Sequence, residues 1–424
     1  MLVVTSNWCV SDGTLAAGPP RGCIGRFRDE VRRSSLRCGF RRDGSYRPVD
    51  AVDVVLAGDT FDWLVSREWT DEVRPWDGGR RAVAALNRVA GVSLQRGNRL
   101  LATLAAWMRR GIKVPVADRR GRPQPSVLRP VPVRVAVLCG DRDRWLERVA
   151  SGWTPAAHGP VIGTSWSDGD VTVRHGAELD PLSVAFDGEP TLGESLAVDL
   201  IGRFGVSVHD IARLRPLAAG LLRRLAGGCP VDAPQRLAAW LEAHDRVATL
   251  PDATRQEVAD AWQRAVELWH RAARRLPPCG DGGVDLVGRV AESLELDPYG
   301  ADPPPAAWLD VVRPMEVDAC STAVLGHPPA DIASSAAWQR QVVCLGPRAC
   351  RVRVGRDDDP GTPTAVVVMS PGRASPQIER QIDWLQMTAV RTSGNQEDGR
   401  GKRGVWLSNE TAESRAVQGI VDAA

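Results

Sequence analysis

Five widely separated segments of this chain share one form, in which an apolar run is followed at once by a polar turn. Such runs, rich in Val, Leu and Ala, are typical of buried strands in a parallel sheet. In open α/β sheets, the residues at the carboxyl ends of these strands gather at one edge, where ligands bind. These strand-end segments therefore predict an α/β fold whose functional residues are spread over most of the chain. They are residues 2–9, 54–62, 135–143, 171–176 and 323–329.

The pattern along the chain indicates an α/β core that is interrupted once. Residues 1–190 carry the first four strand-end segments and are expected to form the first part of the core. Residues 191–310 are expected to form a helical insertion or cap. Strand-like sequence returns in residues 311–390, which are expected to complete the core. Residues 391–424 are polar and Gly-rich and are expected to form a flexible tail.

Hydrophobic periodicity predicts individual helices. Residues 80–110 are expected to form a long helix of the core, and residues 195–204 and 211–225 two amphipathic helices of the insertion. Thr254 and Glu257 have the spacing of a capping box and predict the start of another helix. Its expected apolar stripe consists of Val258, Ala261, Trp262, Ala265, Val266 and Trp269, and that of the long core helix of Ala84, Val89, Leu100, Leu104 and Trp107.

Composition excludes several classes of protein. The net charge is +2, and no basic run is interleaved with aromatic residues, which argues against a specific nucleic-acid partner. None of the nine cysteines is spaced Cys-x-x-Cys, which argues against a structural zinc site and a disulfide framework. No apolar run reaches the roughly 18 residues of a membrane span, and no signal peptide is recognisable. A cytoplasmic protein is expected.

In their order, the strand-end segments resemble the calcineurin-like metallophosphoesterases, whose motifs run Asp-x-His, Gly-Asp-x-x-Asp, Gly-Asn-His-Asp/Glu, His-Gly and Gly-His-x-His. Residues 74–77, 175–181 and 191–194 look like a long-insert bacterial branch of the family, similar to the UDP-2,3-diacylglucosamine hydrolases. The resemblance covers about residues 1–210 and 310–355. It implies a four-layer α-β-β-α sandwich with two metal ions, which together hold a hydroxide for attack on phosphorus.

The resemblance implies a complete set of ligands for one of the two metals. Asp59 matches the carboxylate that bridges both metals, and Asp141, His175 and His327 match ligands of metal two. Asp62 takes the second acidic position of its motif and is expected to hold the metal ligands in place without binding the ion itself. Carboxylate and imidazole groups of this kind suit Mn, Fe or Zn.

The positions that match the ligands of metal one are degenerate. Asn7 and Cys9 stand where the family has Asp and His, and Pro329 has no ligating side chain. The losses therefore sort by metal, which favours a site with one divalent ion. Two alternatives stay open. The residues at metal two are inherited and hold no ion, or Cys9 as a thiolate and Asn7 as a carbonyl ligand rebuild a two-metal centre.

Two further residues bear on catalysis. Arg142 replaces the His that contacts the scissile phosphate and assists the leaving group in the family, and Asp143 keeps the final acid of the motif. Arginine can grip phosphate oxygens, but it stays protonated and cannot act as a general acid near neutral pH. Alternatively, Asp143 and Arg142 form a solvated ion pair with no role in catalysis.

Two classes of function follow. The first is a metallophosphoesterase-like hydrolase of a phosphomonoester, phosphodiester or pyrophosphate with a mononuclear metal site. The second is a non-catalytic relative that binds a phosphorylated ligand or a protein partner. A small phosphorylated ligand is the expected partner in the first, and the sequence leaves the oligomeric state open.

Overall fold

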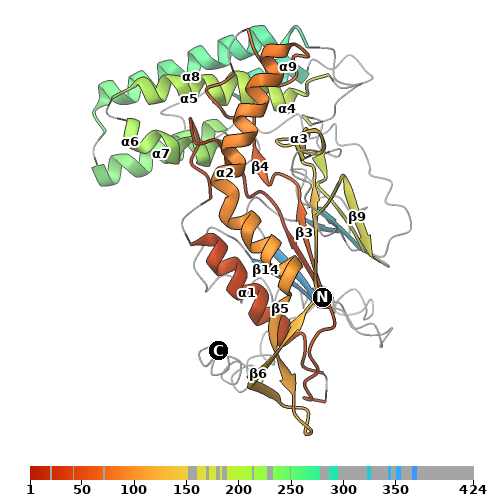
Figure 1. Cartoon of the computed structure of the whole chain (residues 1–424). Coiled ribbons are helices and arrows are strands. Elements are labelled where there is room, and N and C mark those ends of the chain that lie inside the picture. Colours follow the sequence, from red (N-terminus) through yellow and green to blue (C-terminus); the bar gives the residue numbers. More distant parts are fainter. Residues whose placement is uncertain are drawn as a thin grey trace, which may run out of the picture.

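A computed structural model describes residues 1–19, 22–41, 43–69, 72–150, 160–168, 171–177, 182–183, 189–212, 214–226, 233–248, 250–276, 286–294, 322–325, 342–344, 350–354 and 365–369. It has the mixed α/β architecture that the sequence predicts (Figure 1). The predicted flexible tail at 391–424 lies outside the described residues. No helix in the described part is long and apolar enough to cross a membrane.

The main sheet has six strands in the order β14-β13-β1-β3-β7-β8. Its central strands β1 (Leu2–Thr5), β3 (Val52–Ala57) and β7 (Val133–Leu138) are adjacent and parallel. Their carboxyl ends therefore meet at one edge of the sheet. The flanking strands are β8 (Val161–Gly163), parallel to β7, and the antiparallel pair β13 (Cys350–Val354) and β14 (Ala365–Met369).

A second sheet has four strands in the order β12-β11-β10-β9. Strands β10 (Val171–Arg174), β11 (Thr322–Leu325) and β12 (Val342–Cys344) are parallel, and β9 (Ser165–Asp168) is antiparallel to β10. In the register of β10 and β11, Arg174 pairs with Leu325. The last residues of these two strands, about 150 positions apart in sequence, thus lie side by side.

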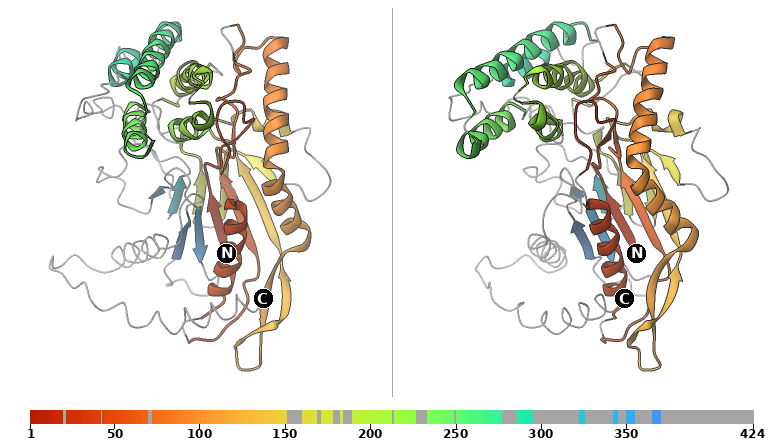
Figure 2. Two further views of the ribbon diagram at one scale, coloured as in Figure 1. Left: turned by 90° about the vertical axis from the view of Figure 1, so that its left-hand side faces the viewer. Right: turned by 60° about the vertical axis from the view of Figure 1, so that its left-hand side comes forward.

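Alternating residues of the main sheet pack into two cores, because successive side chains of a strand point to opposite faces. Val54 and Leu56 pack with the helices α1 (Cys23–Arg37) and α2 (Arg80–Arg110). Val55 and Ala57 pack with Val173 of the second sheet. The described core thus has a helical layer and two facing sheets (Figure 2). The fourth, helical layer of the predicted sandwich stays a prediction.

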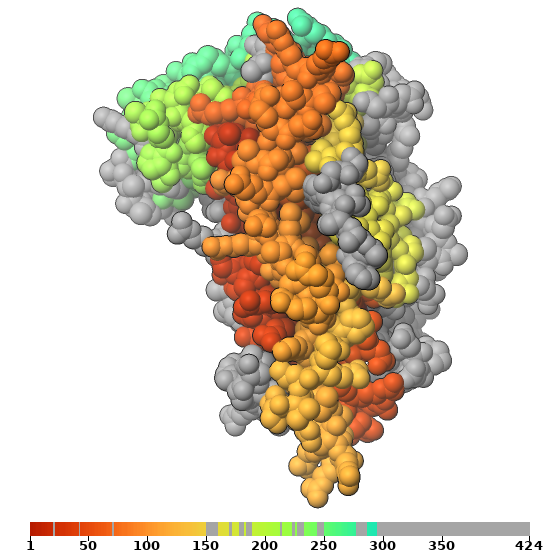
Figure 3. All heavy atoms as spheres, in the orientation of Figure 1, coloured from red at the N-terminus to blue at the C-terminus, as the bar shows by residue number. Residues whose placement is uncertain are grey.

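Helix α2 confirms the predicted long helix at 80–110. Four of its five predicted apolar positions are buried, whereas Ala84 is exposed and Ala85 takes its place in the core. The opposite face of the helix lies on the surface of the molecule (Figure 3). Helix α2 leads into a hairpin of β5 (Ile112–Ala117) and β6 (Pro123–Val131), which projects at the end of the molecule opposite the helical insertion (Figures 1 and 3).

Between residues 192 and 294, all the secondary structure that the structure describes is helical, as predicted for the insertion. The predicted capping box at Thr254 and Glu257 is wrong, because helix α8 begins two residues earlier, at Asp252. Its predicted apolar stripe is buried throughout. The insertion consists of α4 (Leu192–Ser195), the π-helix η2 (Leu196–Gly202), α5 (Arg203–Asp210), α6 (Arg215–Ala226), α7 (Ala233–Ala248), α8 (Asp252–Ala273) and α9 (Leu286–Ser293).

The insertion packs on the loops that leave the carboxyl ends of β1 and β3. Leu15 and Ala16 follow β2 (Val10–Ser11), and Val65 follows β4 (Phe61–Asp62); these three residues are buried in the core of the insertion. Strands β2 and β4 pair in parallel and join the two loops. The helices therefore lie at the same edge of the main sheet as the predicted site.

Candidate metal centre

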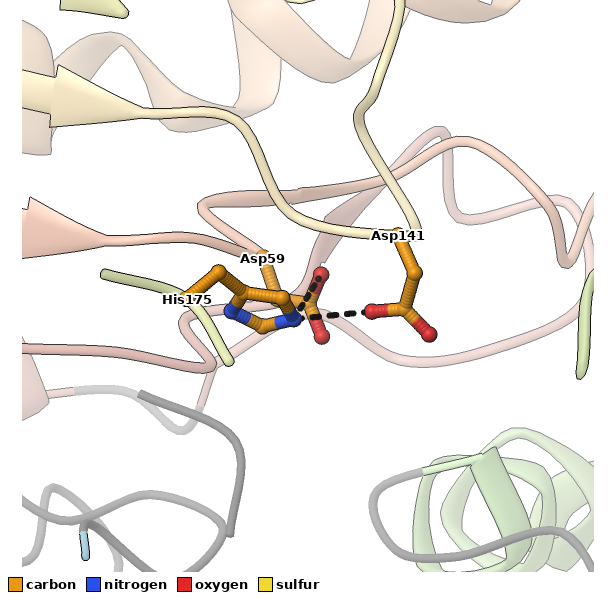
Figure 4. Close-up of side chains that lie close together, drawn as sticks. All are labelled: Asp59, Asp141 and His175. Atoms are coloured by element: carbon orange, nitrogen blue, oxygen red, sulfur yellow. Dashed lines mark hydrogen bonds and ion pairs between the residues drawn. The ribbon is translucent and has the colours of Figure 1, made fainter. Parts of the chain in front are cut away.

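Three predicted ligands converge from three strand ends (Figure 4). Asp59 lies two residues beyond β3, Asp141 three residues beyond β7, and His175 directly after β10. One ligand atom of each lies within 4.8 Å of the other two. The predicted convergence is thus confirmed for these three residues. His327 follows β11 by two positions, but it lies outside the described residues, so its role as a ligand stays a prediction.

The spacing of the three groups suits a shared cation. His175 Nε2 lies 2.9 Å from Asp141 Oδ1 and 3.6 Å from Asp59 Oδ1. Two atoms that bind one ion at about 2.1 Å each are about 3.0–3.6 Å apart when the bond angle is about 90–120°. A buried imidazole and two carboxylates therefore offer a fitting donor set for one divalent ion.

The backbone orients the imidazole of His175. Its Nδ1 lies 3.0 Å from the carbonyl oxygen of Ala57, to which it donates a hydrogen bond, and Nε2 is then directed at the carboxylates. Metal-binding histidines are commonly held in this way, with the second ring nitrogen on a carbonyl group. The close approach depends on Gly58, which has a φ of 86°, because a Cβ atom there would collide with the His175 ring.

Backbone conformation is unusual at this site. In the described part of the chain, the non-glycine residues with positive φ are Asn7 (55°), Cys9 (47°) and Asp59 (52°). Each costs about 1–3 kcal/mol and persists only where other contacts enforce it. Here the Cys9 amide donates to the Asp59 carbonyl at 2.9 Å, and the Asn7 amide donates to the Gly58 carbonyl at 3.3 Å. The loops after β1 and β3 are therefore locked together, which places Asp59 firmly.

Arg142 does not extend toward solvent. Its guanidinium is buried, with Nη1 donating to Asp62 Oδ2 at 3.0 Å and Nε 3.6 Å from Asp59 Oδ2. Its amide also donates to Asp59 Oδ1 at 3.1 Å. Burial works against the charge, but Asp62, Cys9 and Asp59 raise the pKa of Arg142 above its ordinary value. The guanidinium thus contacts carboxylates, and the expected grip on a phosphate stays a prediction.

Asp143 has a different environment from the one predicted. It is fully buried and accepts hydrogen bonds from the amides of Gly140 at 2.7 Å and Phe61 at 3.1 Å. The interpretation as a solvated pair with Arg142 is wrong, because both side chains are buried and the guanidinium contacts Asp62 and Asp59. Asp143 ties the loop after β7 to the loop after β3. A catalytic role for it stays a prediction.

Negative charge exceeds positive charge at this edge of the sheet. The strand-end acid cluster, defined as Asp59, Asp62, Asp141 and Asp143, faces the guanidinium of Arg142 and the imidazole of His175, which is charged only when protonated. Burial and the neighbouring Asp141 raise the pKa of Asp59. Burial alone would lower the pKa of His175, but Asp59 and Asp141 outweigh it and raise this pKa. The four carboxylates thus outnumber the positive charges beside them, and a divalent ion would reduce this excess of negative charge.

Of the two degenerate positions at the end of β1, Cys9 lies outside the group of ligands. Asn7 donates from Nδ2 to Ser6 Oγ at 3.0 Å. Among the residues that the structure describes, Asp59, Asp141 and His175 form the only group of three or more His, Cys, Asp or Glu side chains close enough to share an ion, and Cys9 is not part of it. Pro329 lies outside the described residues. Within the described residues, the group could hold a metal ion, and the number of ions stays a prediction.

The sequence interpretation missed residues that link the site to the insertion. Ser183 Oγ donates to Asp141 Oδ2 at 3.3 Å. Arg144 Nε lies 2.7 Å from Glu194 Oε1, and Glu194 forms the capping box of α4 with Thr191. The Thr-x-x-Glu spacing of residues 191–194 could have revealed this cap, whereas no sequence signal pairs Arg144 with Glu194.

Comparison with known proteins identifies no relative: no family model matches the sequence, and no curated protein or solved structure does. The site must therefore be interpreted from its own geometry.

Proposed function

We propose that the chain is a metallophosphoesterase-like protein that binds a phosphorylated ligand through one divalent ion held by Asp59, Asp141 and His175. The convergence of these three side chains from separate strand ends carries the proposal. The order of the strand-end segments supports the likeness to metallophosphoesterases. An ion at such a site supplies Lewis-acid polarisation of a phosphoryl oxygen and a bound water of lowered pKa.

The chain's own residues can position a ligand but offer little help to a leaving group. His175 is fixed by Ala57, and Asp59 by the amide of Arg142, so the donor set is preorganised. Arg142 cannot release a proton near neutral pH, and this loss of general-acid assistance typically costs 10²–10⁴-fold in rate. We therefore infer that hydrolysis of a simple phosphodiester is slow.

The second candidate function is binding without turnover. The observation that favours it is the pairing of Arg142 with Asp62 and Asp59, which uses the side chain at the position of the catalytic His. A retained phosphate ligand would then be recognised by the ion alone. Turnover distinguishes the two candidates.

The test combines metal content with hydrolysis of a chromogenic phosphodiester in Mn²⁺. Wild-type protein should hold one ion and hydrolyse the ester slowly, and Asp59→Asn should lose both properties. Asp53→Asn is a matched control: Asp53 is a buried acid of β3, the strand that precedes Asp59, but it pairs with Arg134 of β7. It should keep ion and activity.

Three other results are informative. Bound ion without turnover in the wild type would select the binding function. Metal-free protein at saturating Mn²⁺ would refute the proposed site. Turnover that survives in Asp59→Asn would place the chemistry elsewhere.

A further inference from the structure

The two oxygens of Asp59 face different cationic groups. Oδ1 lies 3.6 Å from His175 Nε2, on the side where Asp141 completes the ligand group. Oδ2 lies 3.6 Å from Arg142 Nε, on the side where Asp62 holds the guanidinium at 3.0 Å. Asp59 therefore stands between a candidate ion site and a fixed positive charge.

The guanidinium is held as firmly as the ligands. Asp62 is itself fixed, because its Oδ1 accepts hydrogen bonds from the amides of Leu64 and Val65 at 3.3 Å. The carbonyl of Arg142 accepts a hydrogen bond from the Trp63 amide at 3.4 Å. The Arg142 guanidinium is buried, paired and restrained on both sides. It therefore keeps its position whether or not a ligand is bound.

The place of the guanidinium also matters. The guanidinium lies beside Asp59 and Asp62 and near Cys9, whose sulfur, when ionised, raises the pKa of Arg142. A second divalent ion that shared Asp59 would need this same space, because Asp59 Oδ2 is the oxygen turned away from His175. The guanidinium and a second ion cannot both occupy the space beside Asp59 Oδ2, because like charges so close together repel strongly in a buried setting.

We propose that the Arg142 guanidinium is a built-in cation that takes the place of a second metal ion beside Asp59, so that the site accepts one divalent ion. The inference rests on the proposed ion site at Asp59, Asp141 and His175. It gives Arg142 a positioning role: the side chain fixes Asp59 and limits the ion stoichiometry, with no contact to the reacting atoms.

The experiment counts Mn²⁺ ions by metal analysis after equilibration with excess Mn²⁺, with melting temperature as a second readout. Arg142→Ala should bind one ion more than the wild type. Without Mn²⁺ it should melt roughly 10 °C lower, because breaking a buried ion pair is costly, and Mn²⁺ should restore most of the loss. Arg142→Lys keeps the charge and should bind as many ions as the wild type.

Two further variants make the comparison specific. Arg142→Ala combined with Asp62→Asn lacks a carboxylate for the additional ion and should return to the wild-type count. Arg74→Ala is the matched control, because it removes an arginine from another buried carboxylate, Asp199, and should leave the count unchanged.

The outcomes separate this inference from the proposed function. An unchanged ion count in Arg142→Ala, or failure of that variant to fold at any Mn²⁺ concentration, would overturn the inference. An additional ion in Arg142→Lys would overturn it too. If the wild type binds no ion but Arg142→Ala binds one, the proposed function fails while the role of Arg142 stands.

Discussion

Two clusters of charged side chains differ in their balance of charge. The strand-end acid cluster has four carboxylates against Arg142 and His175. The insertion-base cluster has the reverse balance, with two carboxylates against three guanidinium groups. Arg74 and Arg203 both contact Asp199, at 3.0 and 3.2 Å, and Arg144 lies beside Glu194. The insertion-base cluster consists of Arg74, Arg144, Glu194, Asp199 and Arg203.

The difference separates a structural ion-pair cluster from a site that needs a ligand. A buried carboxylate is costly unless it is paired, and Asp199 is paired twice over. The strand-end acid cluster has no such surplus of cations. Its Asp59 has a positive φ, as do Asn7 and Cys9 in the loop that is hydrogen-bonded to it. Backbone strain and unbalanced charge together are features of sites at which proteins bind ligands or catalyse reactions.

The largest effect should follow from removal of the imidazole. His175→Ala deletes a ligand that is held by Ala57 and buried between the two carboxylates, so Mn²⁺ binding should become undetectable by calorimetry. Loss of outer-shell support alone costs about 10–100-fold in affinity, and loss of a direct ligand costs more. Wild-type affinity in this variant would show that the strand-end acid cluster is not a metal site.

The insertion-base cluster should respond in stability and leave metal affinity unchanged. Asp199→Ala strands Arg74 and Arg203 without their carboxylate, and we expect a loss of about 3–5 kcal/mol in the free energy of unfolding. Urea denaturation measures this loss. Arg81→Ala, in an exposed pair with Glu72, should cause no measurable change. A large fall in Mn²⁺ affinity on Asp199→Ala would contradict the separation of the two clusters.

A smaller effect concerns pH. Burial raises the pKa of Glu194 to about 7, although Arg144 and the Thr191 amide lower it. The folded state therefore holds this proton more tightly than the unfolded state, and stability from Glu194 is complete below about pH 4.5. It is lost as the pH rises toward about 7, by up to about 3 kcal/mol.

Glu194→Gln isolates this contribution from other acids of the molecule. The variant stays neutral, so its free energy of unfolding should fall less between pH 5 and pH 8 than that of the wild type. Urea denaturation measures the free energy of unfolding at the two pH values. An equal fall in the variant and the wild type would show that Glu194 of the folded wild type is ionised throughout this range.

The strand-end geometry could be predicted from sequence because it follows from a general rule. Apolar runs form adjacent parallel strands whose carboxyl ends meet, so Asp59 and Asp141 had to converge once the main sheet formed. His175 follows a strand of the second sheet, and the strand pattern alone does not say that the two sheets face each other. The paired partner of Arg142 could not be predicted, because the contact with Asp62 spans 80 residues and depends on a loop conformation. Local rules also failed at Thr254, where Asp252 began the helix instead.

The smallest effect should come from the thiol at the end of β1. Cys9→Ser keeps the size of the side chain and the left-handed backbone, and the amide can still donate to the Asp59 carbonyl. Because Cys9 is not part of the ligand group and Arg142 occupies the space beside it, Mn²⁺ affinity should change less than about threefold, well below the 10–100-fold effect of losing an outer-shell partner. Calorimetric titration of Cys9→Ser beside His175→Ala provides the contrast. A loss of Mn²⁺ affinity comparable to that of His175→Ala would mean that the thiol binds metal. The site would then be a two-metal centre, and the proposal of a single ion would be wrong.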